Sequence, residues 1–219
     1  MMNVKVQDIH TQLRSFHKQG KKIFISSSFQ THSIPLLHIM STSEVPFDVI
    51  FINTGFHFPE TILFRDELEN RLNLNVIDLR SHVPKVQQKD SDNQFYYVSD
   101  PDYCCFLNKT KPMESILMTY DVWVNGVRAD QSAVRKQMKT LQPAPFDTLR
   151  FHPILDWSSK EIYQYRKAYD LPEHPLDSQG YQSIGCAPCT RKIDLNNERD
   201  ARWFGMNKTE CGLHTDLIQ

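Results

Sequence analysis

The chain has 219 residues, of which 40% are hydrophobic and 23% are charged, and its formal net charge is −1. This length suits one domain with a substantial core, and the near-neutral charge excludes a general electrostatic attraction to nucleic acid or to a membrane surface. No apolar run approaches the length of a membrane span and residues 1–20 lack the apolar core of a secretory signal, so we expect a cytoplasmic protein with reduced cysteines.

Apolar runs and amphipathic patterns alternate along most of the chain. In chain order they predict a strand at 23–25, a helix within 30–43, a strand at 49–52, a helix at 58–73, a strand at 74–79, a helix at 111–120, a strand from 121, an extended segment at 148–157 and a helix at 158–171. Ser158 or Ser159 is the expected N-cap of the last helix. Residues 80–102 and the chain after Pro172 carry little regular pattern.

Strands that alternate with helices predict βαβ units. The expected fold class is therefore α/β, a parallel twisted sheet with helices on both faces, followed by a less regular C-terminal segment. In such folds ligands bind beyond the carboxyl ends of the strands. We therefore expect a ligand site at the loops that follow the strands at 23–25, 49–52 and 121–125.

The first of these loops, "SSSFQTHS" at 26–33, is rich in hydroxyl groups and precedes a predicted helix. Backbone N–H groups and hydroxyls at a helix start can bind a phosphate, but a serine-rich helix cap explains the same residues equally well. The loop lacks the glycine and lysine of a Walker A motif.

The five cysteines fall into two pairs and a single residue: Cys104 with Cys105, Cys186 with Cys189, and Cys211. An odd number argues against a disulfide framework. Four sulfur ligands suit zinc or an iron–sulfur cluster. Adjacent cysteines favour the cluster, which is larger than a single zinc ion. The adjacent pair can converge only in a helix or turn, because successive side chains on a strand point to opposite faces. Two unrelated buried pairs, or a redox-active Cys186–Cys189 pair, remain the alternatives.

Five motifs follow one another over about residues 22–214. In chain order they are "SSSFQTHSIPLLH", "INTGFHFPET", "WVNGVRADQSAVR", "LRFHPILDWSSKEIYQYRKAYDLPEHPLDSQGY" and "ECGLH". Together they resemble the adenylyl-sulfate and phosphoadenylyl-sulfate reductase family of the adenine nucleotide alpha-hydrolase-like superfamily. The resemblance implies a single reductase domain over residues 1–219 with a catalytic tail from about 203–219.

The resemblance also implies roles for individual residues. Cys211 is the expected nucleophile, and His214 could support its thiolate. The other four cysteines, Cys104, Cys105, Cys186 and Cys189, are expected to hold a [4Fe-4S] cluster. The expected substrate-binding residues are Ser26, Ser27, Ser28, Phe29, Thr54, Gly55, Lys109, Gly126, Arg128, Arg199 and Arg202.

Three positions depart from the pattern of relatives. Gln30 replaces a frequent glycine, Asn53 replaces a frequent aspartate, and Asn108 replaces a frequent arginine. We expect the local backbone at Gln30 and the positive field near Lys109 to differ accordingly.

The activity implied by the resemblance is reduction of adenosine 5′-phosphosulfate to sulfite and AMP through a cysteine S-sulfonate. One thiol cannot supply two electrons and recover unaided, so thioredoxin or a glutaredoxin is the expected partner. The 3′-phosphorylated substrate, or both substrates, stays open. A non-catalytic nucleotide- or zinc-binding regulator is a more remote alternative, and an ATP-dependent tRNA thiolation enzyme is disfavoured by the missing pyrophosphatase loop. A homo-oligomer is possible, since the sequence does not fix the oligomeric state.

Overall fold

The computed structural model describes residues 2–192, 201–203, 205, 206, 208, 210–214 and 217. Arg199 and the side chain of His214, two of the predicted site residues, lie outside this description. Within it, no helix combines the length and the apolar character needed to cross a membrane.

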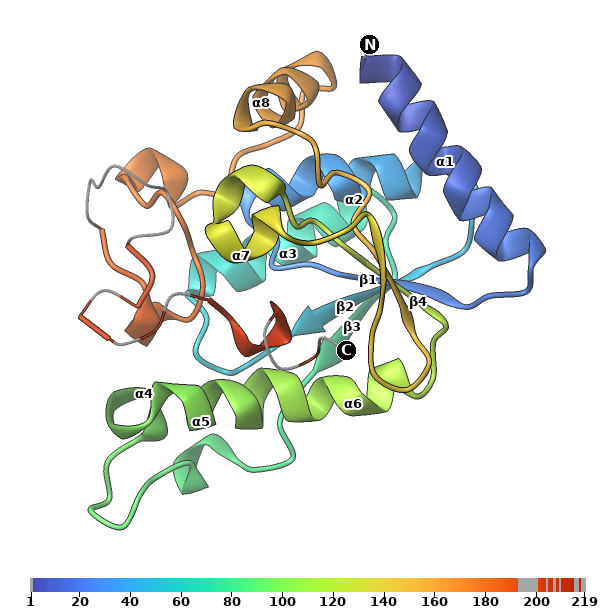
Figure 1. Ribbon diagram of the computed structural model, residues 1–219. Coiled ribbons are helices and arrows are strands. Elements are labelled where there is room, and N and C mark those ends of the chain that lie inside the picture. Colours follow the sequence, from blue (N-terminus) through green and yellow to red (C-terminus); the bar gives the residue numbers. More distant parts are fainter. Residues whose placement is uncertain are drawn as a thin grey trace.

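A six-stranded sheet forms the centre of the described part, in the order β3-β2-β1-β4-β6-β5 (Figure 1). The strands are β1 (Ile23–Ser26), β2 (Asp48–Ile52), β3 (Val76–Leu79), β4 (Val122–Asn125), β5 (Leu141–Pro143) and β6 (Leu149–Phe151). All neighbours pair in parallel except β5, which is antiparallel to β6. The predicted α/β class is confirmed. The sequence did not predict β5, because this edge strand has three residues and no apolar run.

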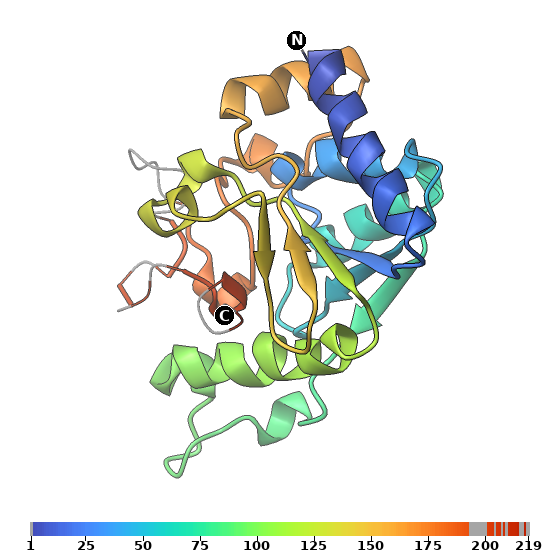
Figure 2. The ribbon, with the colours of Figure 1, turned by 45° about the vertical axis from the view of Figure 1, so that its right-hand side comes forward.

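Helices cover both faces of this sheet. They are α1 (Met2–Lys18), α2 (Ile34–Ser41), α3 (Pro59–Arg71), α4 (Tyr96–Ser99), α5 (Pro101–Cys105), α6 (Lys111–Leu117), α7 (Ala133–Lys136) and α8 (Ser159–Ala168), with a π-helical turn at Phe106–Thr110 between α5 and α6. Figures 1 and 2 show α1, α2 and α8 on one side of the sheet and α4–α6 on the other. The sequence analysis missed α1, although its buried residues recur at helical spacing.

The two faces of the sheet have separate cores because side chains alternate along each strand. Ile23 and Ile25 of β1 enter the larger core, which packs against α1, α2 and α8. Phe24, between them, enters the smaller core with Trp123 and with Leu217 from the C-terminal tail. The tail is therefore anchored on the α6 side of the sheet, and in Figures 1 and 2 its dark red part, residues 210–214, lies between the strand ends and α5–α6.

Local capping sets the start of α8 as the sequence predicted. The Ser158 hydroxyl accepts from the Glu161 backbone N–H at 3.2 Å, and the Glu161 carboxylate accepts from the Ser158 backbone N–H at 2.8 Å. This reciprocal pair is a capping box, which satisfies N–H groups that the first turn of a helix leaves open. Ser158, and not Ser159, is the N-cap.

Candidate active site

A cavity of about 200 Å³ lies at the carboxyl ends of β1, β2 and β4. The loops after all three strands reach it, as expected for a parallel α/β sheet. The predicted residues that line it are Ser26, Ser27, Ser28, Thr54, Lys109, Gly126, Cys186, Arg202 and Cys211. The fold therefore brings together residues that are up to 185 positions apart in the chain, from Ser26 to Cys211.

Phe29 and Arg128 were predicted to bind the substrate, but neither lines this cavity. The Phe29 ring is fully buried and packs edge-on against Phe51 at a centroid distance of 5.7 Å. The buried Arg128 guanidinium donates to Asp130 at 3.0 Å and to the Ser159 hydroxyl at 2.8 Å. In this arrangement both side chains hold the surrounding loops, and a direct ligand contact by either stays a prediction.

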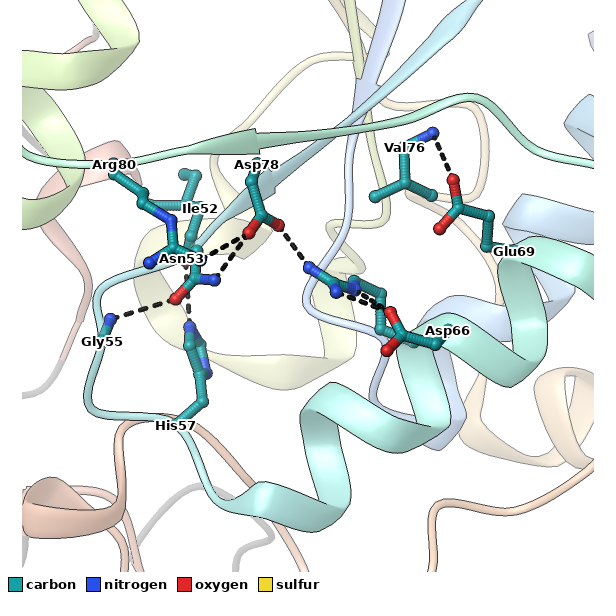
Figure 3. Close-up of polar contacts among 10 residues, drawn as sticks. Ile52, Asn53, Gly55, His57, Asp66, Glu69, Val76, Asp78 and Arg80 are labelled. Atoms are coloured by element: carbon teal, nitrogen blue, oxygen red, sulfur yellow. Dashed lines mark hydrogen bonds and ion pairs between the residues drawn. The ribbon is translucent and has the colours of Figure 1, made fainter.

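The loop after β2 is fixed by a polar network on β3 (Figure 3). The Asn53 amide donates to Asp78 at 2.8 Å and accepts from the Gly55 backbone N–H at 3.1 Å, where the backbone is left-handed and favours glycine. Arg65 and Arg80 also pair with Asp78. Burial raises the pKa of Asp78, but the hydrogen bonds from Arg80 and Asn53 and the charge of Arg65 hold it below its usual range. An aspartate at position 53 would set a second carboxylate against Asp78, which explains the asparagine.

His57, from the same loop, lines the cavity as a neutral group. Its Nε2 lies 2.9 Å from the Ile52 carbonyl oxygen and must donate to it, so Nδ1 carries the lone pair. Burial lowers the pKa of His57 to about 4, and the charges of Lys109 and Arg202 act in the same direction. Within the described residues Nδ1 has no hydrogen-bond partner. His57 therefore offers a neutral acceptor in a cavity that Lys109 and Arg202 also line.

Gln30 connects the first loop to the segment that carries the second cysteine pair. Its side-chain amide donates to the Ile184 carbonyl and accepts from the Ile184 backbone N–H at 3.2 Å. The loop after β2 is linked to the same segment, because the Thr54 hydroxyl oxygen and the Cys186 sulfur lie 3.3 Å apart. A glycine at position 30 could make neither bond to Ile184, so the departure from relatives has a structural role here.

All four paired cysteines surround one small cavity, and each is 6–9% exposed. Cys104 and Cys105 end helix α5, so they have the convergent geometry that the sequence analysis required of them. Cys186 and Cys189 lie at the 3-10 turn Ala187–Cys189. The four cysteines therefore line one shared cavity, while their role as ligands of one group stays a prediction.

The thiols affect one another electrostatically. Burial, followed by the charges of Cys105, Cys186 and Cys189, raises the pKa of Cys104 to about 12. Burial therefore favours the neutral thiol form of Cys104. Among the described residues, no group of three or more histidine, cysteine, aspartate or glutamate side chains is arranged to hold one metal ion.

Lys109 lines both cavities and so lies between the four-cysteine site and the larger cavity. Burial lowers the pKa of Lys109, but the charges of Cys211, Cys186 and Cys105 outweigh this effect and raise it above its usual value. Its ammonium therefore stays protonated. The π-helical turn that carries Lys109 is a local distortion often found at functional sites.

Asn108, beside it, is a buried structural residue. Its amide donates to the Cys104 carbonyl at 2.9 Å and exchanges hydrogen bonds with Gln88 at 2.9 and 2.6 Å. An arginine here would bring a charge into a neutral, fully bonded amide pair. Of positions 108 and 109, Lys109 alone therefore carries a positive charge.

Arg202 enters the larger cavity from the C-terminal segment. Its Nη1 donates to the Ile184 carbonyl at 3.1 Å, and the guanidinium carbon stacks 4.6 Å from the Trp203 ring centroid. A Cβ placed on Gly185 would lie 2.2 Å from Arg202 Nη2. Gly185 therefore leaves the space in which the guanidinium lies.

Cys211 is half-buried and lines the same cavity. The sequence analysis did not assign functional roles to His57 and Asn125, which also line this cavity. Asn125 ends β4 at 3% exposure, and within the described residues neither polar atom of its amide has a hydrogen-bond partner. Its position at the carboxyl end of a central strand was the available signal.

These features define a class: an α/β protein with a cavity at the carboxyl edge of its sheet, one lysine and two arginines in the cavity lining, four cysteines around a neighbouring cavity and a fifth thiol on the wall. The model of the phosphoadenosine phosphosulfate reductase domain matches residues 22–192. The chain is 32% identical to adenosine 5′-phosphosulfate reductase of Salinibacter ruber, over 91% of this chain and 80% of that one. It is 36% identical to that of Streptomyces coelicolor, over 89% and 83%. The chain belongs to the phosphoadenosine phosphosulfate reductase family.

Solved structures agree on the fold. A phosphoadenylyl-sulfate reductase of Candida auris, in a phosphate complex, superposes with a TM-score of 0.67 at 19% identity, covering 81% of this chain and 87% of that one. An FMN adenylyltransferase of Candida glabrata superposes with a TM-score of 0.60 at 16% identity, covering 90% and 71%. These superpositions agree with the predicted α/β fold of a parallel sheet covered by helices.

Proposed function

We propose that this chain reduces adenosine 5′-phosphosulfate to sulfite and AMP, with thioredoxin or a glutaredoxin as reductant. One observation carries the proposal: Lys109 lines both the four-cysteine cavity and the cavity that Cys211 reaches. A cation shared in this way serves an anionic substrate and a buried group of thiolates together. The relatives named adenosine 5′-phosphosulfate reductase support the choice of substrate.

In this proposal the cavity binds the nucleotide along the loops after β1, β2 and β4. Ser26, Ser27, Ser28, Thr54 and Gly126 supply hydroxyl and backbone contacts to its phosphate and ribose. Lys109 and Arg202 hold the sulfate, since ammonium and guanidinium groups suit its oxygens. Arg199 is proposed as a second sulfate ligand from outside the described residues. Phe29, Gly55 and Arg128 contribute by shaping the loops.

The four paired cysteines fit a [4Fe-4S] cluster. All four side chains offer sulfur as the donor, and all four residues line one cavity. Cys104, Cys105, Cys186 and Cys189 would hold it. When bound, the cluster supplies a buried charge and orders the two segments that carry these residues, while Lys109 balances that charge.

Cys211 is the proposed nucleophile, on a catalytic tail of about residues 203–219 within one domain. Its thiolate attacks the sulfate sulfur, a sulfur–sulfur bond forms, and the bond between that sulfur and the bridging phosphate oxygen breaks. AMP leaves with the electron pair, and Cys211 carries an S-sulfonate. His214 is proposed to assist.

An external dithiol completes the reaction. One of its thiolates attacks the Cys211 sulfur and expels sulfite, and its second thiol resolves the mixed disulfide, returning Cys211 as a thiolate. The two electrons gained by the substrate sulfur thus come from the dithiol. Such a reductant and a reduced Cys211 belong to a reducing compartment, so we propose the cytoplasm.

The test measures sulfite release from adenosine 5′-phosphosulfate and from its 3′-phosphorylated form in parallel, with reduced thioredoxin. Cys211→Ser is expected to abolish release, and retained activity would refute the nucleophile. Preference for the 3′-phosphorylated form would correct the substrate. Iron with acid-labile sulfide in anaerobically purified protein supports the cluster, whereas zinc alone would overturn it and favour a regulator.

A further inference from the structure

Arg135 and Glu210 form a buried ion pair between α7 and the C-terminal tail. The guanidinium Nε donates to Glu210 Oε2 at 3.0 Å, and Nη2 donates to Oε1 at 2.9 Å. The two side chains are 7% and 4% exposed, so the pair is poorly screened by water. Ser132, the N-cap of α7, donates to the same carboxylate at 3.3 Å. This geometry makes the contact specific to one position of the tail.

The same carboxylate holds the residue that carries the thiol. The Cys211 backbone N–H donates to Glu210 Oε1 at 3.1 Å. Arg135 and Cys211 also line the same cavity. The position of the Cys211 sulfur at the cavity therefore depends on the grip of Arg135 on Glu210, across 75 positions of sequence.

The tail must also be able to leave. With Cys211 and Leu213 on its wall the cavity measures about 200 Å³. Pockets that bury a small molecule usually measure about 300–1,000 Å³. A nucleotide therefore needs more room than this arrangement of the wall provides, and outward movement of the tail would supply it. A buried ion pair suits a contact that forms and breaks, because its attraction is largely offset by the desolvation of both charges.

We propose that the Arg135–Glu210 pair is a latch that docks the tail and positions the Cys211 sulfur at the cavity. The proposal rests on the proposed function only for the role of Cys211 as nucleophile. Arg135 and Glu210 are positioning residues that act through Cys211, and they alter how often its sulfur lies at the cavity.

The first test measures alkylation of Cys211 by iodoacetamide in anaerobic, substrate-free, full-length protein. Trypsin cleavage after Lys208 gives the peptide 209–219, in which Cys211 is the one cysteine, so mass spectrometry follows this thiol alone. The plateau rate at high pH is compared, because there the thiolate fraction no longer matters. Loss of two charged hydrogen bonds in Arg135→Met is expected to raise the rate about tenfold or more.

Companion variants distinguish the latch from general loosening. Glu210→Gln removes the charge but keeps a side-chain oxygen that can accept, and it is expected to raise the rate in the same way. Arg166→Met is the matched control, since Arg166 is also 7% exposed and pairs with Glu173 elsewhere. An unchanged rate in Arg135→Met, or an equal rise in Arg166→Met, overturns the latch.

A second arm uses adenosine 5′-phosphosulfate. The latch predicts that Arg135→Met and Glu210→Gln both lower kcat and leave KM within about twofold. A raised KM in Arg135→Met with normal kinetics in Glu210→Gln would instead make Arg135 a substrate ligand and overturn the latch. If wild-type protein does not reduce the nucleotide, the proposed function fails, while the alkylation arm still decides the latch.

Discussion

Replacing Gly185 by alanine is expected to displace the Arg202 guanidinium from the cavity with little effect on the fold. The Gly185 backbone is not left-handed, so it accepts a side chain without strain. The added Cβ would lie 2.2, 2.3 and 2.5 Å from the three outer atoms of the guanidinium. Since ordinary contact begins at 3.4 Å, the group must retreat by about 1.2 Å.

The size of the effect on KM follows from the loss of the proposed hydrogen bond between the Arg202 guanidinium and the substrate sulfate. A hydrogen bond to a charged group contributes about 1.5–3 kcal/mol, and each 1.4 kcal/mol is about tenfold in affinity. We therefore expect Gly185→Ala to raise KM for adenosine 5′-phosphosulfate by about 10–100-fold. The free energy of unfolding should fall by about 1–3 kcal/mol, the usual cost of overpacking a buried site.

Steady-state kinetics and urea unfolding measure the two effects, and a double-mutant cycle tests their cause. In an Arg202→Ala background the clash no longer exists, so Gly185→Ala should change KM by less than about twofold. Gly126→Ala controls the unfolding measurement, because its Cβ would meet its nearest neighbours at 3.7 and 3.8 Å. If the effects of Gly185→Ala and Arg202→Ala on KM simply add, the steric reasoning is wrong.

Three further predictions concern positions around the site. Asn53→Asp should lower the free energy of unfolding by about 1–3 kcal/mol by facing Asp78 with a second carboxylate, and Asp78→Asn in that background should restore it; urea titration that shows no rescue contradicts the network. The buried His174 has its pKa lowered by burial to about 4 from 6.5. The contribution of neutral His174 to the free energy of unfolding is therefore complete above pH 6.5 and is lost as the pH falls from 6.5 to 4, at up to about 1.4 kcal/mol per pH unit. His174→Gln should flatten the plot of unfolding free energy against pH in that window. An unchanged slope refutes this prediction. Gln30→Ala should release Ile184 and speed iron loss to a chelator, followed by absorbance, whereas wild-type retention would show that this clamp does not support the cluster.

Local sequence was sufficient where a contact or pattern is local. The alternation of apolar runs and amphipathic stretches predicted the α/β class. Ser158 predicted the start of α8, because its side chain accepts a hydrogen bond from the backbone N–H of Glu161, three positions along the chain. The cysteine spacing predicted a shared site for Cys104 and Cys186 with their partners. Cysteine side chains are chemically distinctive, so their presence in pairs was by itself information about a functional site.

Tertiary structure decided which of the cations reach the cavity. Arg128 belongs to a family-like motif, yet its guanidinium bonds to Asp130 and Ser159, whereas Arg135 in the same motif lines the cavity and binds Glu210. Ser159 and Glu210 lie 31 and 75 positions from the arginines that they contact, and no local pattern records which arginine will meet them. The sequence by itself determined the chemical groups and the order of the elements, while folding determined their pairing, because the direction of a long side chain depends on contacts made by residues distant in the chain.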